Sequence, residues 1–436
     1  MNILTTSILV AISIIAIIIL TSKFKLNAFI ALFAASLFLA FATLPAGNTI
    51  GVLKDGFGGT MSSIGFLVIL GAIIGITLDK TGGTLSIAKY ILSKTGEKRS
   101  AAALGMTGFI TGLPIFCDSG FIILSGLARS LGARAGLAMP FVATVLATSL
   151  YSVHCLIPPH PGALAAAGIM NANTGQLVIM GILFAIPGAL AAFMWSKHMS
   201  RTCPPASATT HTQPDTETLP SPFVSFLPVF VPLLLITMKS LLPVTPGIGS
   251  KIITVAGEPV YALSAGVVLA LALLTGKRRI RLNDIFKESI EKAGPILIIT
   301  AAGGMFGAVI KATGTGETLG RLLSDANMGL LVPFIIAAVM KTAQGSSTVA
   351  IITAASLVSP MLPALGLHTE QGRLFATLAM GAGSMFVSHA NDSYFWVISN
   401  FSGIDSRETL KVYSTSTIVM GCVVFALVWL ASVFML

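Results

Sequence analysis

The sequence predicts an all-α integral membrane protein made of two inverted repeats, each with about five transmembrane helices, one re-entrant hairpin and one broken helix. Three observations predict this fold: scarce charge, long apolar runs, and polar or proline-rich breaks within the apolar regions. The 436-residue chain is 54% hydrophobic and only 10% charged, whereas a soluble domain carries about 25% charged residues. Uncharged runs near the roughly 20 residues of a membrane-spanning helix lie at 2–21, 26–46, 60–78, 176–196, 259–276 and 412–436.

The internal repeat is predicted from short matches that recur in the same order. The segment Leu78–Leu85 has a counterpart in Ile310–Leu319, about 230 residues later, and Ser152–His154 has one in Val387–His389 at a similar displacement. Similarity common to all membrane helices is the alternative explanation. The expected organisation is a first membrane repeat at 1–196, a cytoplasmic linker rich in Pro, Ser and Thr at 197–222, and a second membrane repeat at 223–436.

The basic residues give an orientation. With an odd number of crossings in each half, 19 of the 26 Lys and Arg residues fall on one side of the membrane. Because Lys and Arg concentrate on the cytoplasmic side, both termini are expected to be periplasmic and the second half is inverted relative to the first. The net charge of +10 is then an orientation signal, and no nucleic-acid partner is expected. The first apolar run has no preceding basic residues, which favours a retained helix over a signal peptide.

A polar segment interrupts an apolar stretch in each half and predicts a hairpin tip. The stretch at about 101–131 is too short for two crossings and suits a re-entrant hairpin, and the stretch at about 328–363 occupies the matching place. Such tips leave backbone N–H groups and helix N-termini free to attract anions. A water-facing cap or surface loop is the alternative. The tip residues are Asp118, Ser119 and Gly120 in the first hairpin, and Gln344, Gly345, Ser346, Ser347 and Thr348 in the second.

A helix break is predicted after each hairpin. The first lies at about 154–162, where three prolines in four positions cannot continue a helix. Histidines flank these prolines, and His160 is the favoured candidate because imidazole titrates near neutral pH. The second break, at about 388–393, holds Asn391 and Asp392. The alternatives are a structural histidine and an ordinary helix end at the cytoplasmic surface.

Together, the tips and breaks predict one binding site near the middle of the membrane, which is typical of secondary transporters. Ionisable groups are costly at this depth, so Asp118, Asp392 and His160 are the candidates for carrying a coupling proton. The sequence shows no Walker A motif, no catalytic motif and no metal-ligand spacing of cysteines. No enzyme activity, cofactor or metal is therefore expected. The pair Gly303-Gly304 is interpreted as a place of close helix packing or a turn.

At these residues the chain resembles the gluconate:proton symporter family of bacterial permeases, over nearly its whole length. The most specific segments are 157–162, 343–350 and 388–396. The resemblance implies a homodimer in the bacterial inner membrane. It also implies uptake of gluconate or a related small hydroxy or sugar acid, coupled to protons, through elevator-type alternating access.

Other functions remain open at this point. Some members of the family carry D-serine, so a permease for D-serine or another small hydroxylated amino acid is the alternative within it. An ion antiporter or channel without an organic substrate is the alternative of a different class, because intramembrane acids and broken helices serve ion transport as well. The neutral donors at the hairpin tips favour a hydroxylated organic anion, with the lipid bilayer as the other partner.

Overall fold

The computed structural model describes residues 3–24, 26–95, 100–203, 219–242, 248–274, 281–313, 328–389 and 392–435, and their regular structure is helical. The first part comprises α1 (Ile3–Ser22), α2 (Ala28–Thr43), α3 (Ala46–Thr81), α4 (Gly83–Thr95), α5 (Ser100–Gly112), α6 (Cys117–Arg134), α7 (Met139–Leu156), α8 (Pro161–Met170) and α9 (Thr174–Met199). The second comprises α10 (Pro222–Leu241), α11 (Ile248–Ala256), α12 (Pro259–Ala272), α13 (Leu282–Thr313), α15 (Leu331–Gln344), α16 (Ser347–Val358), the 3₁₀ turn η2 (Ser359–Met361), α17 (Glu370–Ser384), α18 (Ser393–Ser402), α19 (Ser406–Thr409), the π-helical turn η3 (Leu410–Ser414) and α20 (Thr415–Met435).

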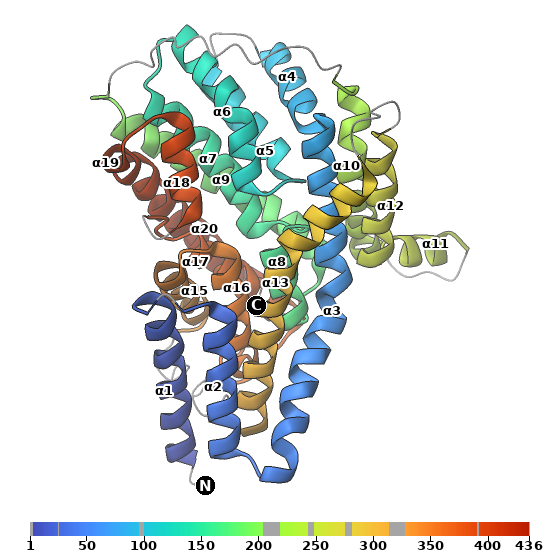
Figure 1. The fold of residues 1–436 in the computed structure, drawn as a ribbon, viewed down its shortest axis with the longest axis vertical. Coiled ribbons are helices and arrows are strands. Elements are labelled where there is room, and N and C mark those ends of the chain that lie inside the picture. The colour runs from blue at the N-terminus through green and yellow to red at the C-terminus, as the bar shows by residue number, and fades with distance from the viewer. Residues whose placement is uncertain are drawn as a thin grey trace.

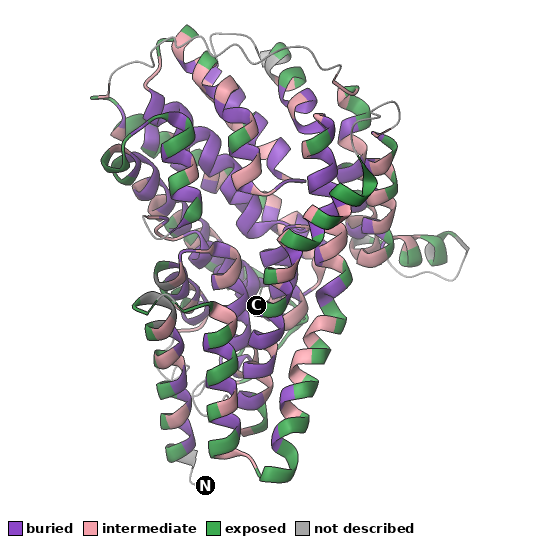
Figure 2. Ribbon diagram, viewed as in Figure 1, coloured by how far each residue is buried: buried purple, intermediate pink, exposed green. Residues whose placement is uncertain are grey.

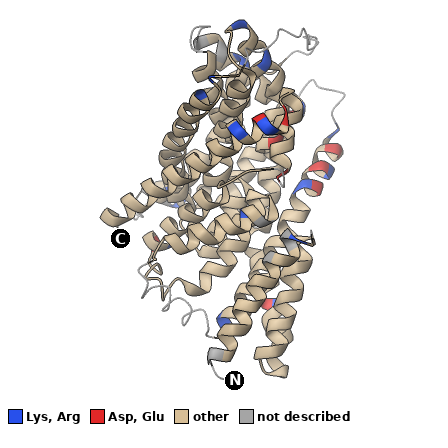
Figure 3. Ribbon diagram, turned by 90° about the vertical axis from the view of Figure 1, so that its left-hand side faces the viewer, with Lys and Arg blue, Asp and Glu red and all other residues tan. Residues whose placement is uncertain are grey.

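Several helices have the length and composition of membrane spans, as the sequence predicts. Those long and apolar enough are Ala46–Thr81, Met139–Met170, Thr174–Met199, Pro222–Ser240, Leu282–Thr313 and Ser406–Met435. Large apolar side chains are exposed on the outer faces of α9 and α20, among them Leu190 and Phe434. Figure 3 shows how little of the ribbon carries charge. Because an apolar outer surface of this kind is stable only in lipid, the all-α membrane class is confirmed.

The long helices α3 and α13 pack along each other and give the molecule its length (Figure 1). Helices α1 and α2 lie beside the end of α3 that is nearer the N-terminus, and α4, α5 and α6 gather at the opposite end. Helix α7 is buried along all 18 of its residues, and burial concentrates in the same central region in Figure 2. Because no face of α7 is exposed, this helix lies in the interior and the other helices pack around it.

Glycine and proline set the helix ends that matter for the site. Helix α7 ends at Leu156 because Pro158 and Pro159 cannot supply helical N–H groups. Helix α15 ends at Gln344, and the φ of 80° at the following Gly345 is the left-handed conformation that glycine adopts at low cost. The Ser346 hydroxyl then accepts the Val349 N–H at 3.3 Å and caps α16. These ends place irregular backbone in the interior of the protein.

The glycine pair predicted to allow close packing does so. A Cβ on Gly304 would lie 1.8 Å from Thr60 Oγ1 of α3, and one on Gly303 would lie 2.5 Å from Ser356 Oγ of α16. Only hydrogen fits on these two faces of α13. The interpretation of Gly303-Gly304 as a packing element is therefore confirmed.

Candidate functional site

A cavity of about 520 Å³ lies where the first turns of α6, α16 and α18 meet α7 and α13. We call it the site cavity. It is lined by six of the residues predicted from sequence: Asp118, Ser119, Ser346, Ser347, Thr348 and Asp392. Residues far apart in the chain thus share one space, in the size range of small-molecule sites.

The other predicted residues have different places. Gly120 is buried in α6, where a Cβ would lie 2.8 Å from Ile115 Cδ1. Gly345 forms the turn between α15 and α16, and both amide atoms of the neighbouring Gln344 are buried without a hydrogen-bond partner among the described residues. None of these three, nor His160, lines the site cavity. Asn391 lies outside the described residues.

The α6 wall of the cavity combines an acid with a basic neighbour from α13. Asp118 lies in the first turn of α6, and its Oδ1 is buried with no hydrogen-bond partner in the described part of the chain. The next residue, Ser119, accepts a hydrogen bond at 3.2 Å from the Lys292 ammonium. Lys292 Nζ also lies 3.5 Å from Glu288 Oε1 and 5.9 Å from the centroid of the Phe116 ring. An ammonium group and a helix N-terminus, both attractive to anions, therefore lie on this wall.

The α16 wall supplies hydroxyl groups. Thr348 Oγ1 lies 3.2 Å from His154 Nε2 of α7, and His154 Nδ1 is buried without a partner among the described residues. Ser346 and Ser347 belong to the same first turn of α16. Because α16 begins here, its N-terminal N–H groups and these hydroxyls face one space.

Asp392 is held by an ion pair inside the protein. Its Oδ2 accepts from Lys341 Nζ at 2.5 Å and from the Ser388 hydroxyl, and its Oδ1 accepts the Tyr394 N–H at 3.0 Å. Lys341 is fully buried and also donates to the Gly345 carbonyl at 2.8 Å. Its ammonium lies 5.6 Å from the centroid of the Tyr151 ring. Since both carboxylate oxygens are engaged, Asp392 joins α15 to the start of α18.

His160 has a structural contact. Its Nε2 lies 2.7 Å from the Gly112 carbonyl oxygen. A carbonyl oxygen only accepts hydrogen bonds, so Nε2 carries the hydrogen. The bond joins the start of α8 to the end of α5. The His154 and His160 ring centroids are 4.8 Å apart, so the two histidines predicted to flank the break do lie together.

Four further residues at or beside the site cavity are not among the predicted site residues. The sequence places Lys292 among the cytoplasmic charges and Lys341 in the polar segment of the second hairpin, Tyr394 lies in the specific segment 388–396, and Tyr151 gives no signal. Tyr151 donates to the Ser384 carbonyl at 3.2 Å and Tyr394 to the Ala147 carbonyl at 3.0 Å. The one available signal was a lysine within an otherwise apolar helix, which is costly unless it is paired.

The chemistry of the cavity suits an organic anion with hydroxyl groups. Lys292 and two helix N-termini attract negative charge, and Ser119, Ser347, Thr348 and His154 can exchange hydrogen bonds with hydroxyls. Among the described residues no group of three or more His, Cys, Asp or Glu side chains is arranged to hold a metal ion.

Comparison with known proteins identifies the family. The profile of the GntP family permeases matches residues 5–434. The chain belongs to the GntP permease family. The resemblance stated from the sequence motifs is thereby confirmed, and this GntP permease is a multi-pass membrane transporter.

Two curated relatives cover nearly the whole GntP chain. The high-affinity gluconate transporter of Escherichia coli (strain K12) is 32% identical, over 95% of this chain and 97% of its own. The gluconate permease of Pseudomonas aeruginosa is 30% identical, over 97% and 96% respectively. The crystal structure of the Alcanivorax borkumensis YdaH transporter superposes with a TM-score of 0.65 at 14% identity, covering 93% of this chain and 97% of that one. That likeness shows a shared fold.

Proposed function

We propose that this GntP permease takes up gluconate or a related small hydroxy or sugar acid across the bacterial inner membrane, together with protons. The observation that carries the proposal is the site cavity, where Lys292, the N-termini of α6 and α16, and a set of hydroxyls meet. The relatives named for gluconate transport support the substrate class.

The carboxylate of the substrate binds at Lys292 in this proposal. The Lys292 ammonium is 3.2 Å from Ser119 Oγ at the start of α6, so a carboxylate there meets both a full charge and the positive end of a helix dipole. The substrate hydroxyls then face Ser347, Thr348 and His154 on the opposite wall. A site built to satisfy hydroxyl groups discriminates strongly against acids that lack them.

Asp118 is the proton carrier that the geometry favours. Asp392 has both oxygens engaged, one of them by Lys341, and His160 is engaged with the Gly112 carbonyl. Asp118 instead has a buried oxygen without a partner in the described part of the chain, and a buried unpaired charge is costly. Protonation of Asp118 removes a negative charge from the cavity and so reduces its repulsion of an incoming anion. Substrate and proton then enter together.

We further propose that two inverted repeats, at 1–196 and 223–436 around the linker at 197–222, form the transporter. What supports this is the order of the helices: a long helix, a turn between two shorter helices, a broken helix and a final span occur as α3, α5/α6, α7/α8 and α9, and again as α13, α15/α16, α17/α18 and α20. Elevator-type movement, a homodimer and periplasmic termini complete the proposal.

The test is transport in proteoliposomes with an imposed proton gradient. Gluconate should accumulate only when the gradient is imposed. Asp118→Asn should lose this accumulation but still exchange internal for external gluconate, because exchange needs binding without net proton movement. Lys292→Gln should raise KM at least about tenfold, the factor that 1.4 kcal/mol corresponds to. Lys251→Gln, an exposed position on α11, is the matched control.

Each alternative has its own outcome in the same assay. Accumulation that ignores the proton gradient would refute proton coupling. Uptake of D-serine in preference to every sugar acid would favour the amino-acid alternative, in which Asp118 pairs with the substrate ammonium. Ion flux with no organic substrate present, and no thermal stabilisation by sugar acids, would favour an antiporter or channel.

A further inference from the structure

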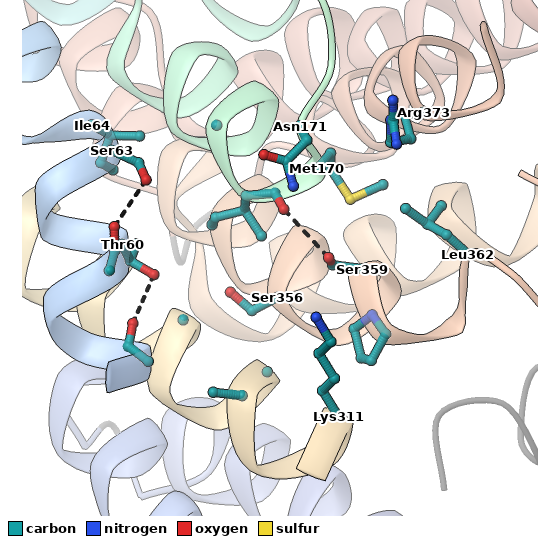
Figure 4. Close-up of a pocket in the computed structure, with 18 of the residues that line it drawn as sticks. Thr60, Ser63, Ile64, Met170, Asn171, Lys311, Ser356, Ser359, Leu362 and Arg373 are labelled. Atoms are coloured by element: carbon teal, nitrogen blue, oxygen red, sulfur yellow. Dashed lines mark hydrogen bonds between the residues drawn. The ribbon is translucent and has the colours of Figure 1, made fainter. Parts of the chain in front are cut away.

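A second cavity, also of about 520 Å³, is formed by α3, α8, α13, α16, η2 and the start of α17. We call it the second cavity. Figure 4 shows Lys311 rising from α13 beside Ser356 and Ser359, with Asn171 and Arg373 across from it. The Ser359 hydroxyl donates to the Ile169 carbonyl at 3.3 Å. None of the residues that line the site cavity lines this one.

Among the described residues, Lys311 and Arg373 bring two positive charges to the second cavity, and Asp55 is the acid that lines it. The Nε of Arg373 is buried and has no hydrogen-bond partner among the described residues. A guanidinium N–H buried without an acceptor is costly, and a carboxylate is the acceptor whose geometry it fits best. Arg373 and Lys311 therefore bring two cationic groups to one cavity, where they can bind the carboxylate of a small organic anion.

The two cavities follow each other along the same two helices. On α13 the site cavity is lined as far as Ile299 and the second cavity begins at Gly304. On α16 the site cavity is lined as far as Val349 and the second cavity begins at Ser356. With a rise of about 1.5 Å per residue, the partition between them is roughly 8–10 Å thick. This is a small part of the roughly 30 Å hydrocarbon core.

The partition itself is tightly packed but contains one unpaired hydroxyl. A Cβ on Gly303, which lies between the two cavities on α13, would be 2.5 Å from Ser356 Oγ, so α13 and α16 leave no room for a larger residue there. Thr353 lies on the face of α16 that also carries Val349 and Ser356, because residues three and four apart share a helix face. Its Oγ1 is buried without a hydrogen-bond partner in the described part of the chain. A polar group thus lies on the direct line between the cavities.

We propose that the second cavity is an anion-binding vestibule, in which Lys311 and Arg373 bind the carboxylate of the substrate on the far side of the partition from the site cavity. The inference rests on the proposed function for its substrate class. A vestibule with positive side chains raises the local concentration of anions, commonly by tenfold or more, and salt weakens the effect.

The first experiment measures the charge of the second cavity without any transport. Ser63, which lines the cavity from α3, is replaced by Cys after Cys117, Cys155, Cys203 and Cys422 have been replaced by Ala. A sulfonate-bearing methanethiosulfonate should then react at least about tenfold faster than a trimethylammonium-bearing one. Lys311→Gln with Arg373→Gln should abolish that preference, and the exposed Lys251→Gln should leave it unchanged. Gluconate should slow the labelling.

Equal reactivity toward both reagents, or a preference that survives removal of both basic side chains, would overturn the vestibule. An intact anion preference with no protection by gluconate, other aldonates, uronates or glycerate would overturn its role in substrate binding. A failure of proton-coupled uptake with labelling as expected would instead count against the proposed function alone, because labelling needs no transport.

The second experiment compares the two faces of the membrane. In sealed vesicles of the two opposite orientations, Lys311→Gln and Arg373→Gln should each raise KM at least about fivefold for entry from one face only. Lys292→Gln, at the site cavity, should raise KM from both. An equal rise from both faces for all three variants would show that the second cavity is not a separate entrance.

Discussion

The ion pair between Lys341 and Asp392 offers the most direct test of the structure. Asp392→Asn keeps an oxygen to accept the Tyr394 N–H, so the cap of α18 survives while the negative charge is lost. Lys341→Met removes the positive charge with a side chain of similar length. The two variants and their combination form a double-mutant cycle for a contact between residues 51 positions apart.

The expected magnitude follows from burial. The two side chains are 0% and 5% exposed, and loss of one partner of a buried ion pair costs about 3–5 kcal/mol because the other charge remains uncompensated. Lys341→Met also removes the donor to the Gly345 carbonyl, which costs about 1 kcal/mol more. The double variant leaves no unpaired charge, so it should be less destabilised than the sum of the single variants by about 2–3 kcal/mol.

The free energy of unfolding can be measured by reversible sodium dodecyl sulfate titration in mixed micelles, followed by circular dichroism. Additive losses in the double variant would refute the reasoning, since they would mean that the two charges do not interact. Single losses below about 1 kcal/mol would refute it as well, because that is the size typical of a solvated surface pair. The remote surface variant Lys251→Gln controls for nonspecific effects of losing a lysine.

Three further predictions concern packing and capping. His160→Leu should lower the free energy of unfolding by about 1–3 kcal/mol, because it leaves the Gly112 carbonyl without its donor, and should leave the pH dependence of uptake unchanged. Gly188→Ala should cost about 1–3 kcal/mol, since the new Cβ would lie 2.5 Å from Val424 Cγ2, and Val424→Ala should recover part of this loss. Ser346→Ala should cost about 1 kcal/mol by removing the cap of α16, whereas Ser346→Asp should keep stability and impair anion uptake.

The same unfolding titration and uptake assays check these variants. Loss of proton-driven uptake in His160→Leu without loss of stability would make His160 a proton carrier and contradict its structural role. A double variant of Gly188 and Val424 no better than the single glycine variant would contradict the close packing of α9 on α20. Normal uptake by Ser346→Asp would place Ser346 away from the bound anion.

The class of protein and the places where its helices break follow from local sequence. A charge in lipid carries a cost wherever it occurs, so sparse charge and long apolar runs reveal membrane helices without knowledge of their partners. Proline acts on its own turn of helix, so Pro158 and Pro159 fix the end of α7 in any tertiary context. The same local signal indicates Asp118 and Ser346, because each lies in a polar segment that interrupts an apolar stretch.

The ion-pair and hydrogen-bond partners of the polar side chains, and the positions of the two cavities, depend on packing between segments that are distant in the sequence. The sequence marks Lys341 as unusual but does not show that Asp392 neutralises it, and it gives Lys292 the appearance of a loop charge although α13 carries it to the site cavity. His160 shows the converse: its titratable ring suggested proton transfer, and the fold directs its Nε2 to a carbonyl instead. Solvation cost is a property of each residue, whereas pairing is a property of two positions that only the folded chain brings together. The sequence by itself therefore determined a GntP membrane protein with polar breaks, and the tertiary structure decided which charges meet and that two cavities lie along α13 and α16.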